Sequence, residues 1–349
     1  MNKAYLDFIK YCIHPEMEVP SNANFIDWIN FMMFCNRQNV MGIVFDGMDK
    51  SNLAIPSNVI YEWLAYYESI KKENRVVNLR LAEVSRFFEE KGLRSCVLKG
   101  QANGLMYPKP ELRSPGDIDI WVEGPPIDII RIVVKECPDA HYSIHHVKMK
   151  KYQDVVVEVH YRPVYLPNWF KDRKLQRYIC KKENEQFCHL EVIDGKPVGT
   201  LTDEFNLIFQ MLHMYNHFFS SRNNLKQLID YYYLLKKNRF EYNRSEAVKW
   251  FKELHVIKYA SGVMWVLKEI LGMEKEFLIV EPNENVGKVI IKELMNFGIN
   301  SGESNLSFVW HQFKGNLRLV GIFPSEVLIS PLFLVWHQWW KLKMKLRLR

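Results

Sequence analysis

The chain has 349 residues, 48% of them hydrophobic, and a formal net charge of +7. Its length and apolar content exclude an intrinsically disordered protein and are typical of two or three packed domains. Five basic residues lie in the last nine, KLKMKLRLR, so the rest of the chain carries 7 − 5 = +2, which argues against a long nucleic-acid groove.

The six cysteines are scattered and form no C-x-x-C pair, so they indicate neither a zinc site nor a disulfide framework. Free thiols of this kind fit a reducing compartment. Near the start of the chain, Asp7 and Lys10 interrupt the apolar core that a signal peptide would need. We therefore expect a cytoplasmic protein.

Residues 1–90 are predicted to form an N-terminal helical cap. Apolar residues recur every three or four positions in YLDFIKYCI, in NFIDWINFMMFCNRQNV and in the long stretch that begins at Ser57. Gly92 follows this last stretch and fits a helix stop. No glycine-rich or acidic cluster in the segment resembles a reactive site.

Residues 91–168 show strand spacing instead. LRSCVLKG is a short apolar run, GDIDIWVEG alternates, and YSIHHVKMKK and DVVVEVHYRP are two further extended segments. Only QANGLMY, between the first two, has the spacing of a helical turn or two. We expect a small mixed α/β domain here.

Residues 169–349 are predicted to form a C-terminal helical bundle with a basic tail. LTDEFNLIFQMLHMYNHFFSS opens on Thr202, which fits an N-cap, with Asp203 and Glu204 in the first turn, where the helix dipole favours acids. Helical spacing continues in NLKQLIDYYYLLKKN, SEAVKWFKELHV and YASGVMWVLKEILG. The expected fold class is therefore α+β, with helices on either side of a small sheet.

The last segment admits two interpretations. Residues 327–340 are largely apolar and end in Trp339 and Trp340 before the basic residues begin, which fits weak contact with an anionic membrane surface. The alternative is a final helix docked on the bundle with a frayed basic end. Pro324, Glu326 and Pro331 leave too short a run to span a bilayer.

The alternating run GDIDIW carries the candidate chemistry. Because side chains of a strand alternate between its faces, Asp117 and Asp119 point the same way while Ile118 and Ile120 point into the core. Two carboxylates about 7 Å apart on one strand can hold a hard divalent cation such as Mg²⁺, which prefers oxygen ligands. The competing interpretation is an exposed edge strand with two solvated acids.

A third acid, Glu158, lies in DVVVEVHYR on the same strand face as His160, with Val155, Val157 and Val159 on the other face. If this strand lies beside the DIDI strand, three carboxylates converge. They can then hold one or two metals and orient a hydroxyl for attack on phosphorus, with Glu158 as metal ligand, general base, or both. Otherwise Glu158 lies on the solvent face of a hairpin.

Lys99 and Gly100 follow the strand SCVL and precede a short helix. At such a position backbone amides and a lysine can meet a phosphate chain. A strand-end lysine in water is the competing interpretation.

The series VLKG, a tyrosine, RSPGDIDIWV and an acid in a later strand resembles the uncharacterised nucleotidyltransferase family of the DNA polymerase β-like superfamily. It is similar too to the nucleotidyltransferase toxins of abortive-infection and toxin–antitoxin systems, whose cores read roughly L-K-G-G and then R-x-S/T-x-D-x-D. The residues that fall on this pattern are Leu98, Lys99, Gly100, Arg113, Ser114, Asp117 and Asp119.

Downstream, HMYNHFFSSRNNLKQLIDYYYLL is similar to the helical motif of the same family, a histidine, a basic loop and then L-x-x-L-x-D. The resemblance covers roughly residues 90 to 235. It departs from the pattern at Lys99-Gly100, where most of the superfamily has Gly-Ser, and at Gln101, where the second glycine of L-K-G-G would be.

The resemblance implies a minimal nucleotidyltransferase fold with Asp117, Asp119 and Glu158 as the metal triad. It implies Mg²⁺ or Mn²⁺ as the cofactor and an NTP, with ATP preferred, as the donor. The residues it suggests for nucleotide binding are Lys99, Gly100, Arg113, His213 and Asp230.

Several of these residues have structural alternatives. Arg113 contacts phosphate or forms an ion pair with Asp117. Asp230 contacts a nucleotide or acceptor, or pairs with Arg222 or Lys226. His213 and His217, four residues apart on one helix face, bind zinc only with a third ligand; otherwise one lines the cleft and the other packs in the bundle.

His145 and His146 are adjacent on a predicted strand and so point to opposite faces, which lets at most one of them reach the site.

The predicted activity is metal-dependent transfer of a nucleoside monophosphate from an NTP to a hydroxyl of an unknown acceptor, which is a small molecule, a protein or an RNA end. One alternative is a catalytically degenerate module that binds a nucleotide or a partner. Another is a glycosidase-type acid pair of Asp119 and Glu158, which needs two carboxylates of different pKa and no metal.

Overall fold

The structure is a computed structural model that describes residues 2–14, 16–220, 223–238, 241–295 and 316–348. Its contacts divide the chain into two compact units that interleave along the sequence. The first comprises Met1–Arg75, Gly104–Pro115 and Ser221–Ser301, and the second comprises Val76–Asn103, Gly116–Ser220 and Gly302–Arg349. The three consecutive domains expected from the sequence stay a prediction.

The first unit is helical among its described residues. Its α-helices are α1 (Lys3–Ile13), α2 (Trp28–Arg37), α3 (Met41–Lys50), α9 (Leu225–Lys237), α10 (Glu241–Glu253), α11 (Ile257–Glu269) and α12 (Glu284–Met295), with three short 3₁₀ helices at Ser21–Phe25, Pro110–Leu112 and Lys275–Phe277. Side-chain caps fix several starts: Asn2 caps α1, Asp27 caps α2, and Asn224 forms a capping box with Gln227 at α9. The long helix α4 (Ser57–Glu89) contributes residues to both units.

A buried ion pair joins two distant segments of this first unit. The Arg113 guanidinium donates to both carboxylate oxygens of Asp230 on α9, each at 2.8 Å, and the Tyr107 hydroxyl donates to the same carboxylate at 2.6 Å. Both charged side chains are nearly inaccessible to water. Burial raises the pKa of Asp230, but the Arg113 charge and these hydrogen bonds outweigh it and lower the pKa.

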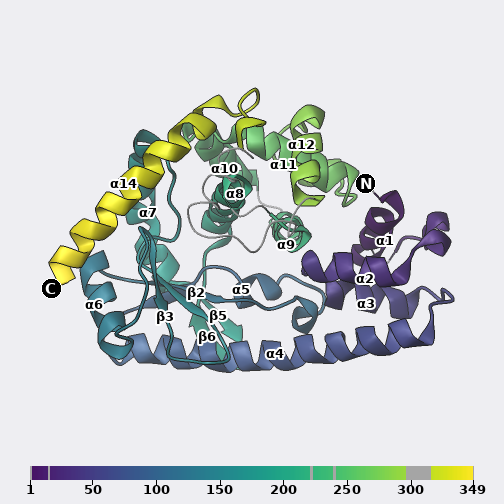
Figure 1. Ribbon diagram of the computed structural model, residues 1–349, viewed down its shortest axis with the longest axis horizontal. Coiled ribbons are helices and arrows are strands. Elements are labelled where there is room, and N and C mark those ends of the chain that lie inside the picture. The colour runs from purple at the N-terminus through teal and green to yellow at the C-terminus, as the bar shows by residue number, and fades with distance from the viewer. Residues whose placement is uncertain (1, 15, 221–222, 239–240, 296–315, 349) are drawn as a thin grey trace. The chain divides into compact units, whose positions relative to one another are not determined.

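The second unit contains a four-stranded sheet and a hairpin (Figure 1). The sheet has the strand order β1 (Ser95–Val97), β2 (Ile118–Val122), β4 (Val157–His160) and β3 (His146–Met149). β2 pairs with β4 in parallel, while β1 and β3 pair antiparallel at the two edges. The helices of this unit are α5 (Gln101–Gly104), which ends at its boundary, α6 (Pro126–Glu136), α7 (Trp169–Cys188), α8 (Asp203–Phe219) and α14 (Pro324–Leu348).

The hairpin consists of β5 (Leu190–Ile193) and β6 (Lys196–Gly199), in a segment that the sequence pattern predicts to be helical. That expectation is wrong for these residues. Asp194 and Gly195 both have positive φ, 51° and 74°, as a tight hairpin turn of the Asp-Gly type requires. The turn signal was therefore present in the sequence.

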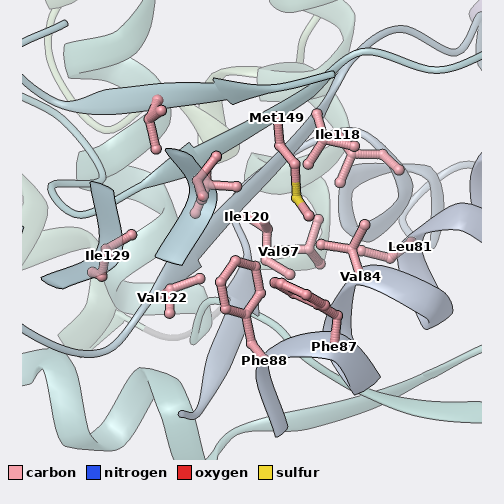
Figure 2. Close-up of a cluster of buried hydrophobic side chains, with 14 of the residues drawn as sticks. Leu81, Val84, Phe87, Phe88, Val97, Ile118, Ile120, Val122, Ile129 and Met149 are labelled. Atoms are coloured by element: carbon pink, nitrogen blue, oxygen red, sulfur yellow. The ribbon is translucent and has the colours of Figure 1, made fainter. Parts of the chain in front are cut away.

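The core of the second unit packs one face of the sheet against α4. Figure 2 shows Leu81, Val84, Phe87 and Phe88 from α4 meeting side chains from the strands. Ile118 and Ile120 of β2 are buried in this cluster, as strand alternation predicts. Each such side chain contributes about 1.5–3 kcal/mol through burial, so the orientation of β2 is firmly set.

Two expectations about helix ends have different outcomes. Gly92 has φ 73° just after the end of α4, in agreement with a helix stop. Thr202 is the N-cap residue of α8, but its hydroxyl donates to Gln186 Oε1 at 3.1 Å instead of accepting a bond from the first turn. The position was predicted correctly and the capping bond was not.

We predict that Asp230→Asn lowers the free energy of unfolding by about 3–5 kcal/mol, because it leaves the buried Arg113 charge without its counterion. Tyr107→Phe is the matched control, since it removes one hydrogen bond to the same carboxylate and is expected to cost about 1.5–3 kcal/mol. Urea unfolding of the three proteins at neutral pH measures both values. A loss for Asp230→Asn no larger than that for Tyr107→Phe contradicts the structural role of the pair.

Candidate active site

The pairing of β2 with β4 brings the predicted acids together. The two strands are parallel neighbours, and their register sets Asp119 directly opposite Glu158. Asp117 lies immediately before β2, and its charge raises the pKa of Lys99 at the end of β1. Asp119 and Glu158 are therefore brought together, as expected if the two strands are adjacent, whereas Asp117 is not in the group of close metal-ligand atoms found among the described residues.

Asp119 is the most buried of the three acids, with 3% of its surface exposed. His160 Nε2 lies 3.0 Å from its Oδ1, and Lys99 Nζ lies 3.0 Å from its Oδ2. Burial raises the pKa of Asp119, but the Lys99 charge and the His160 hydrogen bond dominate and hold it far below its usual range. Asp119 is thus a buried carboxylate on an interior strand, and the interpretation as a solvated edge-strand acid is wrong.

Lys99 lies at the turn from β1 into α5. Gly100, in the left-handed conformation at φ 63°, allows the chain to turn there. Lys99 Nζ also lies 3.2 Å from His213 Nε2. Burial lowers the pKa of Lys99, but the charges of Asp119 and Asp117 outweigh it and raise the pKa, so Lys99 is a fixed positive charge beside the acids.

Glu158 is held between basic side chains from the neighbouring strand. Lys148 Nζ lies 3.0 Å from Oε1, and His146 Nδ1 lies 3.4 Å from Oε2. His160 Nε2 is 4.0 Å from the same Oε2. The interpretation as a solvent-facing hairpin acid is wrong, because the side chain is only slightly exposed and faces Asp119 across the pairing.

His160 offers a nitrogen ligand next to the two carboxylates. Its Nδ1 is 3.3 Å from the carbonyl oxygen of Arg162, which can only accept, so Nδ1 carries a hydrogen. The other ring nitrogen, Nε2, faces the carboxylate of Asp119. It carries a proton if the ring is charged and a lone pair if the ring is neutral, and only the lone pair can bind a metal. The ligand atoms of Asp119, Glu158 and His160 all lie within 4.8 Å of one another.

These donors fit a divalent metal. The Oδ2 atom of Asp119 is buried and accepts no hydrogen bond of good geometry within the described part of the chain, although Lys99 is near. Two carboxylates and an imidazole are common ligands of Mn²⁺ and other transition ions, and the carboxylates alone suit Mg²⁺. A bound ion would take the place of the Lys99 ammonium at this oxygen.

His145 and His146 are both close to this group, which corrects the expectation that at most one could be. Their rings are each 5.3 Å from the His160 ring, and His146 Nδ1 is 3.0 Å from His145 Nε2. The reason is that β3 begins at His146, so His145 lies outside the strand and strand alternation does not apply to it. Burial is the main cause that lowers the pKa of both histidines, to about 4 for His146.

His213 and His217 lie together on α8, with their Nε2 atoms 3.1 Å apart. Burial and then the Lys99 charge lower the pKa of both, to about 4 for His217, so both are neutral at pH 7. Among the residues that the structure describes, no His, Cys, Asp or Glu joins them as a third metal ligand. Because His213 lies beside Lys99, its position agrees with the interpretation in which one of the two histidines lines the site.

Arg113 and Asp230, expected at the nucleotide, belong to the first unit and bind each other there. The pairing differs from those considered from sequence, which were Asp117 for Arg113 and either Lys226 or Arg222, the latter outside the described residues, for Asp230. A direct nucleotide contact by Arg113 or Asp230 stays a prediction. The pairing could not be read from the sequence, because the two positions are 117 residues apart.

Sequence reasoning did not assign His146, Lys148 or His160 to the site. For His160 the signal was present, since it shares a strand face with Glu158. For the other two it was absent, because only the β3–β4 register places Lys148 opposite Glu158 and His146 opposite His160.

A cavity of about 200 Å³ opens beside the histidines, within the second unit. One of its walls is Tyr165, whose ring lies 4.7 Å from the His145 ring and stacks on Phe333 of α14 at 5.3 Å. The remaining lining residues come from α7, α8 and α14 and the segment before α7. Its size suits one ring system, since cavities for whole drug-sized ligands measure about 300–1,000 Å³.

Three comparisons bear on the identity of the chain. No curated protein matches its sequence. Among solved structures it is similar to an antigenic nucleotidyltransferase-like protein from Paracoccidioides brasiliensis, with 11% identity, a TM-score of 0.33, and coverage of 60% of this chain and 95% of that one. The sequence profile of a family described as uncharacterised nucleotidyltransferase matches residues 24–272. Since that match spans most of the chain, including every residue of the acidic site, the protein belongs to this nucleotidyltransferase family.

Proposed function

We propose that the protein transfers a nucleoside monophosphate from an NTP, with ATP as the preferred donor, to a hydroxyl group of an acceptor. The observation that supports this most strongly is the register that sets Asp119 opposite Glu158 with Lys99 at 3.0 Å. In the reaction the acceptor oxygen bonds to the α-phosphorus, the bond to the bridging oxygen breaks, and pyrophosphate leaves. The hydroxyl proton passes to Glu158 or to water.

The residues divide this work by their charge and position. A bound Mg²⁺ or Mn²⁺ would neutralise phosphate oxygens and lower the cost of charge that develops on the leaving group. Asp119 and Glu158, with Asp117 from the same strand end and His160 between them, are the side chains that would hold it. Lys99 supplies a fixed positive charge for the triphosphate, as its raised pKa permits.

A glycosidase-type pair is less well supported. That chemistry needs one carboxylic acid whose pKa is raised so that it can protonate a leaving group. The pKa of Asp119 is instead far below its usual range, because Lys99 and His160 stabilise its charged form. A buried carboxylate that stays ionised is suited to binding a cation.

The main alternative function is a module that binds a nucleotide but does not turn it over. The close approach of Asp119, Glu158 and His160, whose ligand atoms lie within 4.8 Å of one another, supports catalysis. The change of Gly-Ser to Lys99-Gly100 supports this alternative, since the four-residue helix α5 offers little backbone to a triphosphate.

We predict that Asp119→Asn lowers pyrophosphate release from ATP by about 10²–10³-fold or more, because it removes the negative charge that holds the metal. Because Asp119 is buried beside Lys99, this variant is also expected to lose stability, so urea unfolding is used to establish that it is folded under the assay conditions before activities are compared. Asp128→Asn, at an exposed acid of α6 in the same unit, is the control and should retain activity. Calorimetry measures the binding of ATP in the presence of Mg²⁺ or Mn²⁺. Pyrophosphate release is then measured with pools of small hydroxyl compounds, proteins and RNA as acceptors.

Full activity of Asp119→Asn contradicts the mechanism. Binding of metal and ATP by the wild-type protein without pyrophosphate release in any pool favours the binding module instead.

We place the donor's nucleobase in the cavity at Tyr165 and Phe333, two ring contacts away from His160 through His145. Aromatic walls bind any base by stacking, which is worth about 1–3 kcal/mol. Ser330→Trp fills the cavity from α14 and is predicted to weaken ATP binding roughly tenfold or more. Inorganic triphosphate has no base, so its binding should not change.

Ser325→Trp, at an exposed position of the same helix, is the control. Equal loss of ATP and triphosphate binding in Ser330→Trp would show general damage to the site, and no loss of either would place the base elsewhere.

A further inference from the structure

The C-terminal helix α14 has one face that is docked within the second unit. Met344 is buried in the hydrophobic cluster of Figure 2, and Trp340 and Leu348 pack against that cluster. Near the start of the helix, Glu326 forms an ion pair with Lys171 at 2.9 Å. A docked face is therefore present, but it packs on the core of the sheet, and the basic end is helical as far as Leu348 instead of frayed.

The opposite face of α14 is apolar and open. Seven large apolar side chains on it are between 42% and 72% exposed. They are Leu328, Leu332, Val335, Trp336, Trp339, Leu342 and Leu346. Their spacing of three and four residues, with one adjacent pair, keeps them on a single side of a helix with 3.6 residues per turn. We call this row the outer stripe.

Such a stripe is uncommon on a protein surface, because contiguous exposed apolar groups cost free energy in water and mark contact sites. Exposed single leucines need no explanation, but here the apolar groups run along about five turns of one helix, from Leu328 to Leu346. The two tryptophans add a preference for the boundary between water and lipid.

The charged residues of α14 that follow Glu326 are all basic. Lys341, Lys343, Lys345 and Arg347 follow within the last two turns, and no Asp or Glu occurs after Glu326. Lys343 Nζ lies over the Trp339 ring at 5.1 Å, so its stem runs along the stripe and its charge reaches the edge. A basic rim beside an apolar row complements an anionic lipid surface.

We propose that α14 lies on an anionic membrane surface with the outer stripe in the interface and its basic residues among the head groups. Among the described residues, no helix is both long and apolar enough to cross a bilayer, so contact is made by lying along the surface. A protein partner would fit the apolar row equally, but the acid-free basic end and the tryptophans favour lipid. This inference does not depend on the proposed catalytic activity.

The test uses the full chain and two kinds of vesicle, one of phosphatidylcholine alone and one of phosphatidylcholine mixed with phosphatidylglycerol. Sedimentation measures binding, and tryptophan emission reports entry into lipid. The wild-type protein should bind the anionic vesicles about tenfold or more tightly than the neutral ones, because each basic residue near the surface adds attraction.

The double variant Leu332→Glu with Val335→Glu places charge in the middle of the stripe and should abolish this binding without unfolding the protein, since both side chains are exposed. Leu190→Glu, at an exposed apolar position of β5, is the matched control and should bind like wild type.

Three results would overturn the proposal. The first is that the wild-type protein does not bind anionic vesicles, and the second is that the wild type and the double variant bind them equally. The third is that, without lipid, the wild type forms a concentration-dependent dimer and the double variant does not. That result would assign the stripe to contact with a second copy of the chain.

Discussion

The register between β2 and β4 is the constraint on which the site depends. Parallel pairing sets Asp119 opposite Glu158, and a slip by one residue would turn one of the two acids into the hydrophobic core. The alternative register is unfavourable because Ile118, Ile120, Val157 and Val159 are all buried on the other face. The packing of α4 against the sheet therefore fixes the chemistry on the opposite side.

Burial makes this arrangement electrostatically demanding. Asp119 is ionised although water hardly reaches it, which requires the two basic neighbours Lys99 and His160. Burial lowers the pKa of His145 and His213, so the site combines the lysine cations Lys99 and Lys148 with carboxylates and neutral imidazoles. Under the proposed function, Asp119 would exchange its Lys99 contact for a metal, and Lys99 would then contact the phosphate chain.

Much of the site followed from local pattern. Alternation in GDIDIW predicted that Ile118 and Ile120 face the core with Asp119 on the other side, and the valines of DVVVEVH predicted the orientation of Glu158. The Asp-Gly turn of the β5–β6 hairpin was equally local and was missed because helices were expected around it. Periodicity alone does not separate short strands from helical turns.

The rest depended on contacts between distant parts of the chain. The Arg113–Asp230 pair, the position of Lys148 opposite Glu158 and the burial of Asp119 all come from tertiary packing, which one sequence does not encode in any short window. The same is true of α14, where composition suggested either docking or a membrane surface, and the structure shows a docked face with an open apolar face behind it.

The central claim is that Asp119 and Glu158 hold a metal that receives a triphosphate. A crystal structure with Mn²⁺ and a non-hydrolysable ATP analogue, phased to show the anomalous signal of manganese, tests it most directly. The account predicts a manganese peak in contact with Asp119 and Glu158, with His160 beside it and Lys99 moved from Asp119 to the triphosphate. An analogue bound elsewhere, with no peak at these acids and Lys99 still paired with Asp119, would contradict it.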